Sequence, residues 1–70
     1  MDDFKKFIQE YFAEDYTYNL DLLKSDELKF IVDYLTELHS KRGNFRIKRI
    51  TNDDTTLEIE VEGGIAALKQ

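Results

Sequence analysis

The sequence predicts a small α+β fold in which two N-terminal helices pack on a C-terminal antiparallel β-hairpin, in the order ααββ. Two observations lead to this prediction. Apolar residues recur at helical spacing through the first 40 residues, whereas between residues 45 and 62 they alternate with polar ones. With 70 residues, 41% hydrophobic and 36% charged, the chain has the size and composition of one globular domain, expected to span 1–70.

The first helix is expected over residues 2–14. Its apolar positions follow the i, i+3, i+4, i+7, i+8 pattern of one helix face: Phe4, Phe7, Ile8, Tyr11 and Phe12. Its polar positions mix lysine with glutamate, whereas a helix that lies on a membrane carries mainly lysine and arginine there. The aromatic stripe is therefore expected to face the core.

Residues 15–24 fit two descriptions. Apolar side chains at 16, 18, 20 and 22 alternate as in a strand, whereas Asn19 is suited to cap a single helical turn. The segment is expected to be a connector with one turn at 20–24. The alternative is a third extended segment of the sheet over 16–22.

The second helix is expected from Ser25, whose hydroxyl is a suitable cap, to about His39. Its core-facing stripe is Leu28, Ile31, Val32, Leu35 and Leu38. Phe30 and Tyr34, one turn apart, widen the apolar arc beyond what one packing partner covers. A second contact, with the sheet or with another copy of the chain, is therefore expected.

Gly43 is expected to end this helix, and a hairpin follows over 45–48 and 57–62. If the apolar residues of both strands share one face, the loop must hold an odd number of residues. The expected register places Thr51 opposite Thr55, Ile47 opposite Ile59, Arg46 opposite Glu60 and Lys48 opposite Glu58. Ile50 then falls on the polar face, which indicates an exposed isoleucine, a bulge or a different register.

The end of the chain carries a weaker signal. Gly63 and Gly64 are expected to end the second strand, and residues 65–68 form a short apolar tail that docks or frays. Two strands alone are marginal and leave two open edges. The third segment over 16–22, or a second chain, is expected to complete the sheet.

The net charge of −5 is the sum of three segments with different net charges. Residues 1–40 carry a net charge of −6, residues 41–51 a net +5 without an acid, and residues 52–70 a net −4. The acidic total disfavours non-specific binding to nucleic acid, because phosphates are repelled by the summed field.

Few residues are suited to catalysis. The chain has no cysteine, one histidine and three glycines, so it lacks thiolate or multi-histidine metal sites and the usual nucleophiles with their bases. The carboxylate pairs Glu10/Glu14 and Asp33/Glu37 are interpreted as solvated helix faces. We expect a protein that is not an enzyme and that uses no cofactor or metal.

Three functions remain. The first is a small acidic protein that binds a basic surface of another protein, as an adaptor, regulator or inhibitor of the kind that bacteria and mobile genetic elements encode. The candidate contact residues are Glu10, Glu14, Phe30, Asp33, Tyr34 and Glu37. Another possible function is that of a structural homo-oligomer, in the simplest case a homodimer.

The second function is nucleic-acid binding by the basic segment 41–49, since a two-stranded ribbon can enter a major groove. Its candidate residues are Lys41, Arg42, Arg46, Lys48 and Arg49. In the expected register Arg46 and Lys48 face glutamates, which leaves Lys41, Arg42 and Arg49 unmatched. No apolar run is long enough to span a membrane, so we expect a cytoplasmic protein without a membrane partner.

Overall fold

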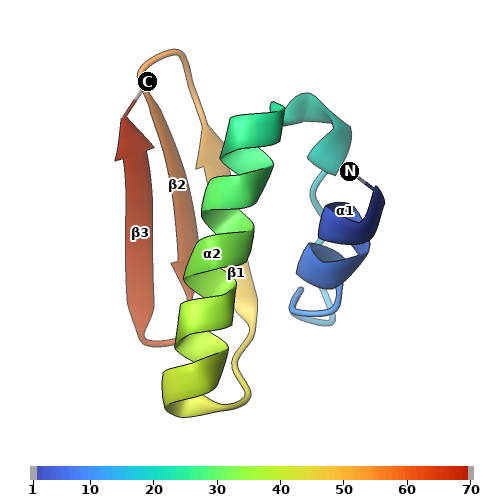
Figure 1. Cartoon of the computed structure of the whole chain (residues 1–70), viewed down its shortest axis with the longest axis vertical. Coiled ribbons are helices and arrows are strands. Elements are labelled where there is room, and N and C mark those ends of the chain that lie inside the picture. The colour runs from blue at the N-terminus through green and yellow to red at the C-terminus, as the bar shows by residue number, and fades with distance from the viewer. Residues whose placement is uncertain (1, 70) are drawn as a thin grey trace.

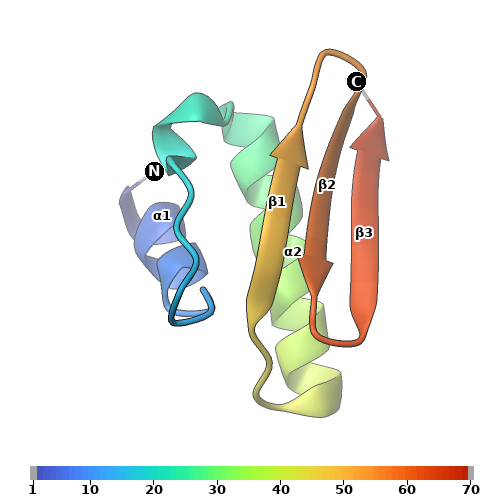
Figure 2. The ribbon, with the colours of Figure 1, turned by 180° about the vertical axis from the view of Figure 1, so that it is seen from behind.

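The computed structural model describes the backbone of residues 2–69 and the side chains of residues 3–69. The elements are helix α1 (Asp2–Gln9), the 3₁₀ turn η1 (Leu20–Leu22), helix α2 (Ser25–Arg42) and strands β1 (Ile47–Asn52), β2 (Thr56–Val61) and β3 (Gly64–Lys69). The strands form one antiparallel sheet in the order β1-β2-β3. Helix α2 lies over one face of the sheet and α1 lies beside α2 (Figure 1), whereas the described elements leave the opposite face without a helix (Figure 2). The predicted α+β class is confirmed, but the sheet has a third strand.

Helix α1 ends at Gln9, five residues before the expected end. The chain then tightens into a turn, in which the Tyr11 amide donates to the Ile8 carbonyl at 3.0 Å. Residues 11–13 next form a short parallel bridge with the start of β1: the Ile47 amide donates to the Tyr11 carbonyl at 2.7 Å, and the Ala13 amide donates to the Ile47 carbonyl at 3.2 Å. Hydrogen bonding to the sheet therefore replaces the last helical turn.

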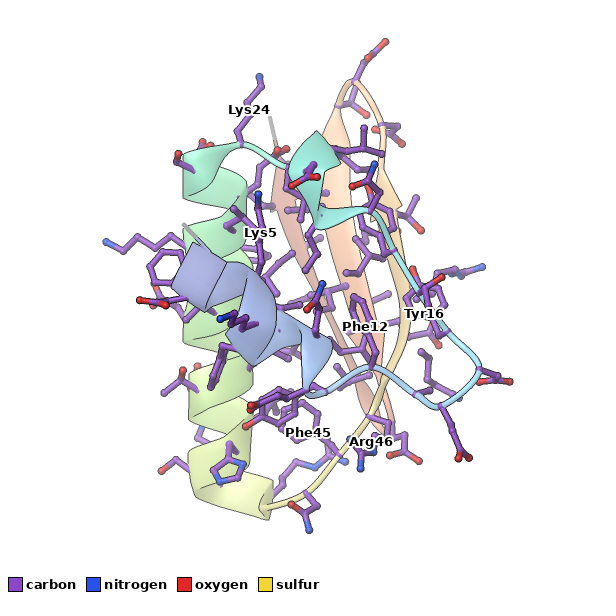
Figure 3. All side chains as sticks on the ribbon, turned by 90° about the vertical axis from the view of Figure 1, so that its right-hand side faces the viewer. Lys5, Phe12, Tyr16, Lys24, Phe45 and Arg46 are labelled. Carbon is purple, nitrogen blue, oxygen red and sulfur yellow. The ribbon has the colours of Figure 1, made fainter. Side chains whose placement is uncertain are left out.

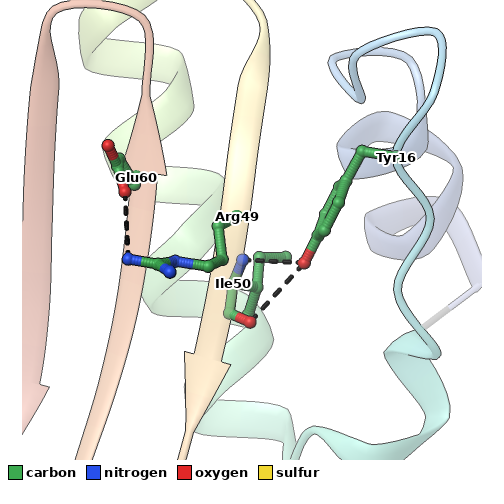
Figure 4. A network of polar contacts seen from close by, with 4 residues as sticks. All are labelled: Tyr16, Arg49, Ile50 and Glu60. Carbon is green, nitrogen blue, oxygen red and sulfur yellow. Dashed lines mark hydrogen bonds and ion pairs between the residues drawn. The ribbon is translucent and has the colours of Figure 1, made fainter.

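The connector contains one helical turn, as predicted, and Asn19 Oδ1 caps it by accepting from the Asp21 amide at 3.1 Å. The alternative, a third strand over 16–22, is wrong: this segment does not pair with the sheet in a ladder. It contacts β1 through one side chain instead. The Tyr16 hydroxyl accepts from the Ile50 amide at 2.8 Å and donates to the Ile50 carbonyl at 3.5 Å (Figure 4). Together with the bridge at Ile47, this contact covers the outer edge of β1.

Helix α2 begins at Ser25, but the cap is Lys24 rather than Ser25. The Lys24 amide donates to the Glu27 carboxylate at 2.7 Å, which explains why Glu27 lies buried near the core. The helix continues to Arg42, three residues past the expected end. It stops at Gly43, whose φ of 76° is accessible mainly to glycine.

The core lies between α2 and the covered face of the sheet. Leu28, Ile31 and Leu35 of the predicted stripe are buried, whereas Val32 and Leu38 pack against the core from partly buried positions. The sheet contributes the buried side chains of Ile47, Ile50, Leu57, Ile59 and Val61, and Phe45, two residues before β1, is buried with them. The shared apolar face of the hairpin is therefore confirmed.

The predicted register of the hairpin is wrong: Ile47 lies opposite a residue two positions further along β2 than expected, and β1 contains a bulge. Ile47 lies opposite Val61 and Arg49 opposite Glu60, so Lys48 is an extra residue without a partner in the ladder. The bulge turns Ile50 onto the covered face, opposite Ile59, where it is only 4% exposed. Four residues, 53–56, now separate the last paired residues of the strands, an even number. The parity argument failed because it assumed unbroken alternation.

The apolar tail is strand β3. It pairs with β2 along its whole length, from Gly64 opposite Val61 to Lys69 opposite Thr56. The two strands are joined by a two-residue turn at 62–63, and Gly63 has a φ of 82°, as a type II turn requires at this position. The third strand therefore comes from the C-terminal tail and not from residues 16–22.

The β1–β2 turn is stabilised by Asp53. Its Oδ1 accepts hydrogen bonds from the Thr55 amide at 2.8 Å, the Thr56 amide at 2.8 Å and the Thr55 hydroxyl at 3.0 Å. These bonds favour the ionised carboxylate, led by that from the Thr55 amide, and lower the pKa of Asp53.

A lowered pKa in the folded state means that Asp53 stabilises the protein above the pH at which the unfolded chain titrates, near 4. The contribution is lost as the pH falls further, through the lowered pKa. We expect Asp53→Asn to reduce the melting temperature at pH 7, and the difference from the unmodified protein to disappear in acid. Asp54→Asn, the same change at the exposed neighbouring position, is the control. Equal effects of both substitutions across the pH range would contradict the prediction.

Candidate functional site

The cations at the end of α2 contact other parts of the chain. Lys41 forms an ion pair with Glu37, one turn earlier, at 2.9 Å. The Arg42 guanidinium donates to the carbonyl of Glu62 at 2.5 Å, and it also lies 2.9 Å from where a Cβ on Gly63 would stand. Arg42 therefore links the end of α2 to the β2–β3 turn.

The cations around β1 are also largely engaged. Arg46 Nη1 donates to the carbonyl of Glu10 at 2.9 Å, and Arg49 forms an ion pair with Glu60 at 3.5 Å (Figure 4). Lys48, on the bulge, has no hydrogen bond or ion pair among residues 3–69. The expected contacts of Arg46 with Glu60 and of Lys48 with Glu58 are absent from the described part of the chain, because the register differs from the predicted one and Lys48 lies in the bulge.

The basic segment 41–49 is therefore not a row of free cations. Lys41, Arg42 and Arg49, expected to be unmatched, each have a partner, and Lys48, expected to be matched, has none in the described part. All five side chains are nevertheless exposed. Their charge remains accessible, and four of them contact another residue of the chain.

Several carboxylates have no such partner. The side chains of Glu10, Glu14 and Asp33 are exposed and form no hydrogen bond or ion pair within residues 3–69. Glu37 is partly neutralised by Lys41. The free negative charge of the candidate residues therefore comes from Glu10, Glu14 and Asp33.

The structure divides the six predicted protein-binding residues into two groups. Glu10 and Glu14 follow α1 in the chain, and the Glu10 carbonyl accepts from Arg46, which lies with Phe12 and Tyr16 near β1 (Figure 3). The second group is on α2 and occupies one helix face at the spacing i, i+3, i+4, i+7: Phe30, Asp33, Tyr34 and Glu37. The two groups do not form one continuous surface.

The α2 group continues onto strand β3. The Tyr34 hydroxyl lies 3.1 Å from where a Cβ on Gly64 would stand, so this helix face adjoins the start of β3. Phe30 and Tyr34 are only half-buried, as are Ala66 and Leu68 on the covered face of β3. Sequence reasoning missed the β3 part of this surface. The signal was present in the glycine pair, which permits a tight turn before a second apolar run.

Shallow depressions surround Arg46. One of about 460 Å³ is lined by Glu14, Asp15, Lys48 and Glu62 as well as Arg46, and another of about 280 Å³ by Glu10 and His39 among others. Both are open and carry charges of both signs. Such hollows suit contact with the side chains of another macromolecule better than enclosure of a small substrate.

His39 has a structural contact. Its Nδ1 lies 3.0 Å from the hydroxyl of Tyr11, whose ring stacks on Phe45 with a centroid distance of 4.7 Å. Within the described residues, no group of three or more histidine, cysteine or acidic side chains is arranged to hold a metal ion. Nor do residues 2–69 include a helix with the length and hydropathy needed to cross a bilayer.

Comparison of the chain with protein-family models, with curated proteins and with solved structures finds no match.

Proposed function

We propose that this protein acts by binding a basic surface of another protein, as an adaptor, regulator or inhibitor and without catalysing a reaction. One observation carries the proposal. Four of the five cations in segment 41–49 contact other parts of the chain, whereas the carboxylates of Glu10, Glu14 and Asp33 are exposed and free within residues 3–69.

Free carboxylates on a small acidic protein attract a basic partner before contact. Complementary charge raises the rate of association more than the final affinity, and salt weakens the attraction over a screening length of about 8 Å at physiological ionic strength. Phe30 and Tyr34, half-buried beside Asp33, offer the apolar contact that keeps a partner in place.

The proposal is tested first by capture. The immobilised protein is compared with the triple variant Glu10→Lys, Glu14→Lys, Asp33→Lys in a lysate of its native host, with mass spectrometry as the readout. Lys48→Glu is the matched control, because Lys48 is exposed and has no partner among residues 3–69. We expect a basic protein that is captured by the unmodified chain and the control but lost with the triple variant.

Kinetics with the captured partner provide the second test. At low salt the triple variant should associate about tenfold more slowly, and the difference should shrink as salt is added. Capture of DNA or RNA that depends on Lys48, with no effect of the acidic substitutions, would contradict the proposal. That result would favour nucleic-acid binding by segment 41–49.

A further inference from the structure

The outer edge of β3 is open. Strand β3 is the last strand of the sheet, and no described segment runs along its outer side (Figure 2). In an antiparallel ladder the backbone groups of alternate residues face the neighbouring strand. The tight turn makes Val61 and Gly64 a hydrogen-bonded pair, so Ile65, Ala67 and Lys69 direct their N–H and C=O groups outward.

This edge lacks the usual protection against pairing. Soluble proteins protect edge strands with charges, prolines, bulges or a covering segment. Residues 64–68 contain no charge and no proline, their pairing with β2 is regular, and the one charge of β3, Lys69, lies at the end of the strand. Ile65 is 59% exposed on the face of the sheet that has no helix. The edge is therefore suited to accept another strand.

We propose that the occupant of this edge is a second copy of the chain, whose own β3 pairs with it in antiparallel orientation. Two-fold symmetry perpendicular to the sheet places both α2 helices on the same side and joins the two sheets into one of six strands. Residues that face each other must then belong to the same face of the sheet. Centring the pair on Ala67 aligns the outward backbone groups and sets Ile65 opposite Lys69 of the second copy.

The charges around the edge favour this occupant. Glu60 lies beside Ile65 on β2, in the same row across the sheet. Lys69 of the second copy enters this row on the other side of Ile65, and its long side chain can extend over the isoleucine toward the Glu60 carboxylate. Symmetry repeats the contact, so each Glu60 gains Lys69 of the other copy beside its own Arg49.

The apolar side chains of β3 also lie opposite apolar side chains of the second copy. On the covered face Ala66 meets Leu68 of the second copy, so that apolar side chains of the two β3 strands lie opposite one another. The free acids Glu10 and Glu14 lie at the opposite, β1 side of the molecule. Self-pairing therefore leaves them accessible, and the inference does not depend on the proposed function.

Two substitutions at one exposed position test the register. Ile65→Glu places an acid opposite Lys69 of the second copy, whereas Ile65→Lys places a cation there, and both remove the same apolar side chain. Sedimentation equilibrium should show a dimer for the unmodified protein at high micromolar concentration. The dimer dissociation constant of Ile65→Lys should exceed that of Ile65→Glu by about tenfold or more, since cross-strand charge pairs occur twice. Equal constants would overturn the proposed register.

A backbone substitution tests the edge itself. Ala67→Pro removes an outward N–H without affecting a bond to β2, and Ala67→Val, which keeps the N–H, is the matched control. We expect Ala67→Pro to sediment as one chain and Ala67→Val as a dimer, with melting temperatures that rise with protein concentration only for the dimer.

A mass of one chain for the unmodified protein at high micromolar concentration would overturn the inference. So would a dimer unaffected by Ala67→Pro. If the protein is monomeric and Ala67→Pro abolishes capture of a different protein, the edge belongs to that partner instead. Capture that survives in the acidic triple variant would contradict the proposed function and leave the dimer unaffected, so the two proposals fail separately.

Discussion

Ile59→Asp is expected to unfold the protein. Ile59 lies in the central strand β2, is fully buried and faces Ile50 on one side and Ala66 on the other. A carboxylate there would have no cation or donor within reach in the apolar core, and it would destabilise the fold by several kcal/mol. A domain of this size has a free energy of unfolding of about 3–5 kcal/mol, so one such change is sufficient.

Glu60→Gln is the control, one residue away on the other face of the same strand. Within residues 3–69 its side chain forms an ion pair with the exposed Arg49, and such surface ion pairs contribute about 1 kcal/mol or less. Circular dichroism during urea unfolding compares the two variants. If both unfold at the same urea concentration, the assignment of the two faces of β2 is wrong.

Tyr16→Phe is the second substitution with a large expected effect. The Tyr16 hydroxyl accepts from the amide of Ile50, a residue that is 4% exposed, so its loss leaves a donor on β1 without a partner. A buried donor without a partner costs about 1–3 kcal/mol, a large share of the stability of a 70-residue domain.

Tyr18→Phe provides the matched control. Tyr18 is also half-buried, but its hydroxyl forms no hydrogen bond with the described residues. We expect a clear drop in the free energy of unfolding for Tyr16→Phe and little change for Tyr18→Phe. Hydrogen exchange at the Ile50 amide should accelerate only in the first variant. Equal losses of stability would show that the hydrogen bond from the Ile50 amide to the Tyr16 hydroxyl does not stabilise the edge of β1.

Features that depend on local periodicity could be predicted from the sequence. The stripe of Leu28, Ile31 and Leu35 locates the buried face of α2, and the alternation from Leu57 to Val61 locates that of β2. In both elements, burial of one apolar face is the main stabilising contribution. The spacing of the apolar residues identifies that face directly.

Features that depend on competition between groups far apart in the sequence could not be predicted from it. The bulge at Lys48 was indicated in the sequence only by Ile50, whose expected place on the polar face fitted an exposed isoleucine, a bulge or a different register. The last turn of α1 is replaced by a bridge to Ile47, 35 residues from Phe12 in the sequence. Helix periodicity alone does not reveal such a partner.

The candidate site also has some features that the sequence predicts and others that it does not. Counting charges correctly found a basic segment between two acidic ones, but it could not show that Arg42 and Arg46 bind backbone carbonyls of Glu62 and Glu10. Every residue has a carbonyl, so the sequence does not mark which one an arginine contacts. The structure was needed to identify the carboxylates that are free within the described residues, because it shows which groups the cations contact.

The asymmetry between the two sheet edges limits how many copies can join. At β1, the bridge to Phe12 and the Tyr16 hydroxyl occupy backbone groups that another strand would need. An incoming chain can therefore pair only at β3, and once two copies have joined there, both ends of the combined sheet are β1 edges. Growth stops at two. A sheet with both edges open would instead extend without limit into a fibril.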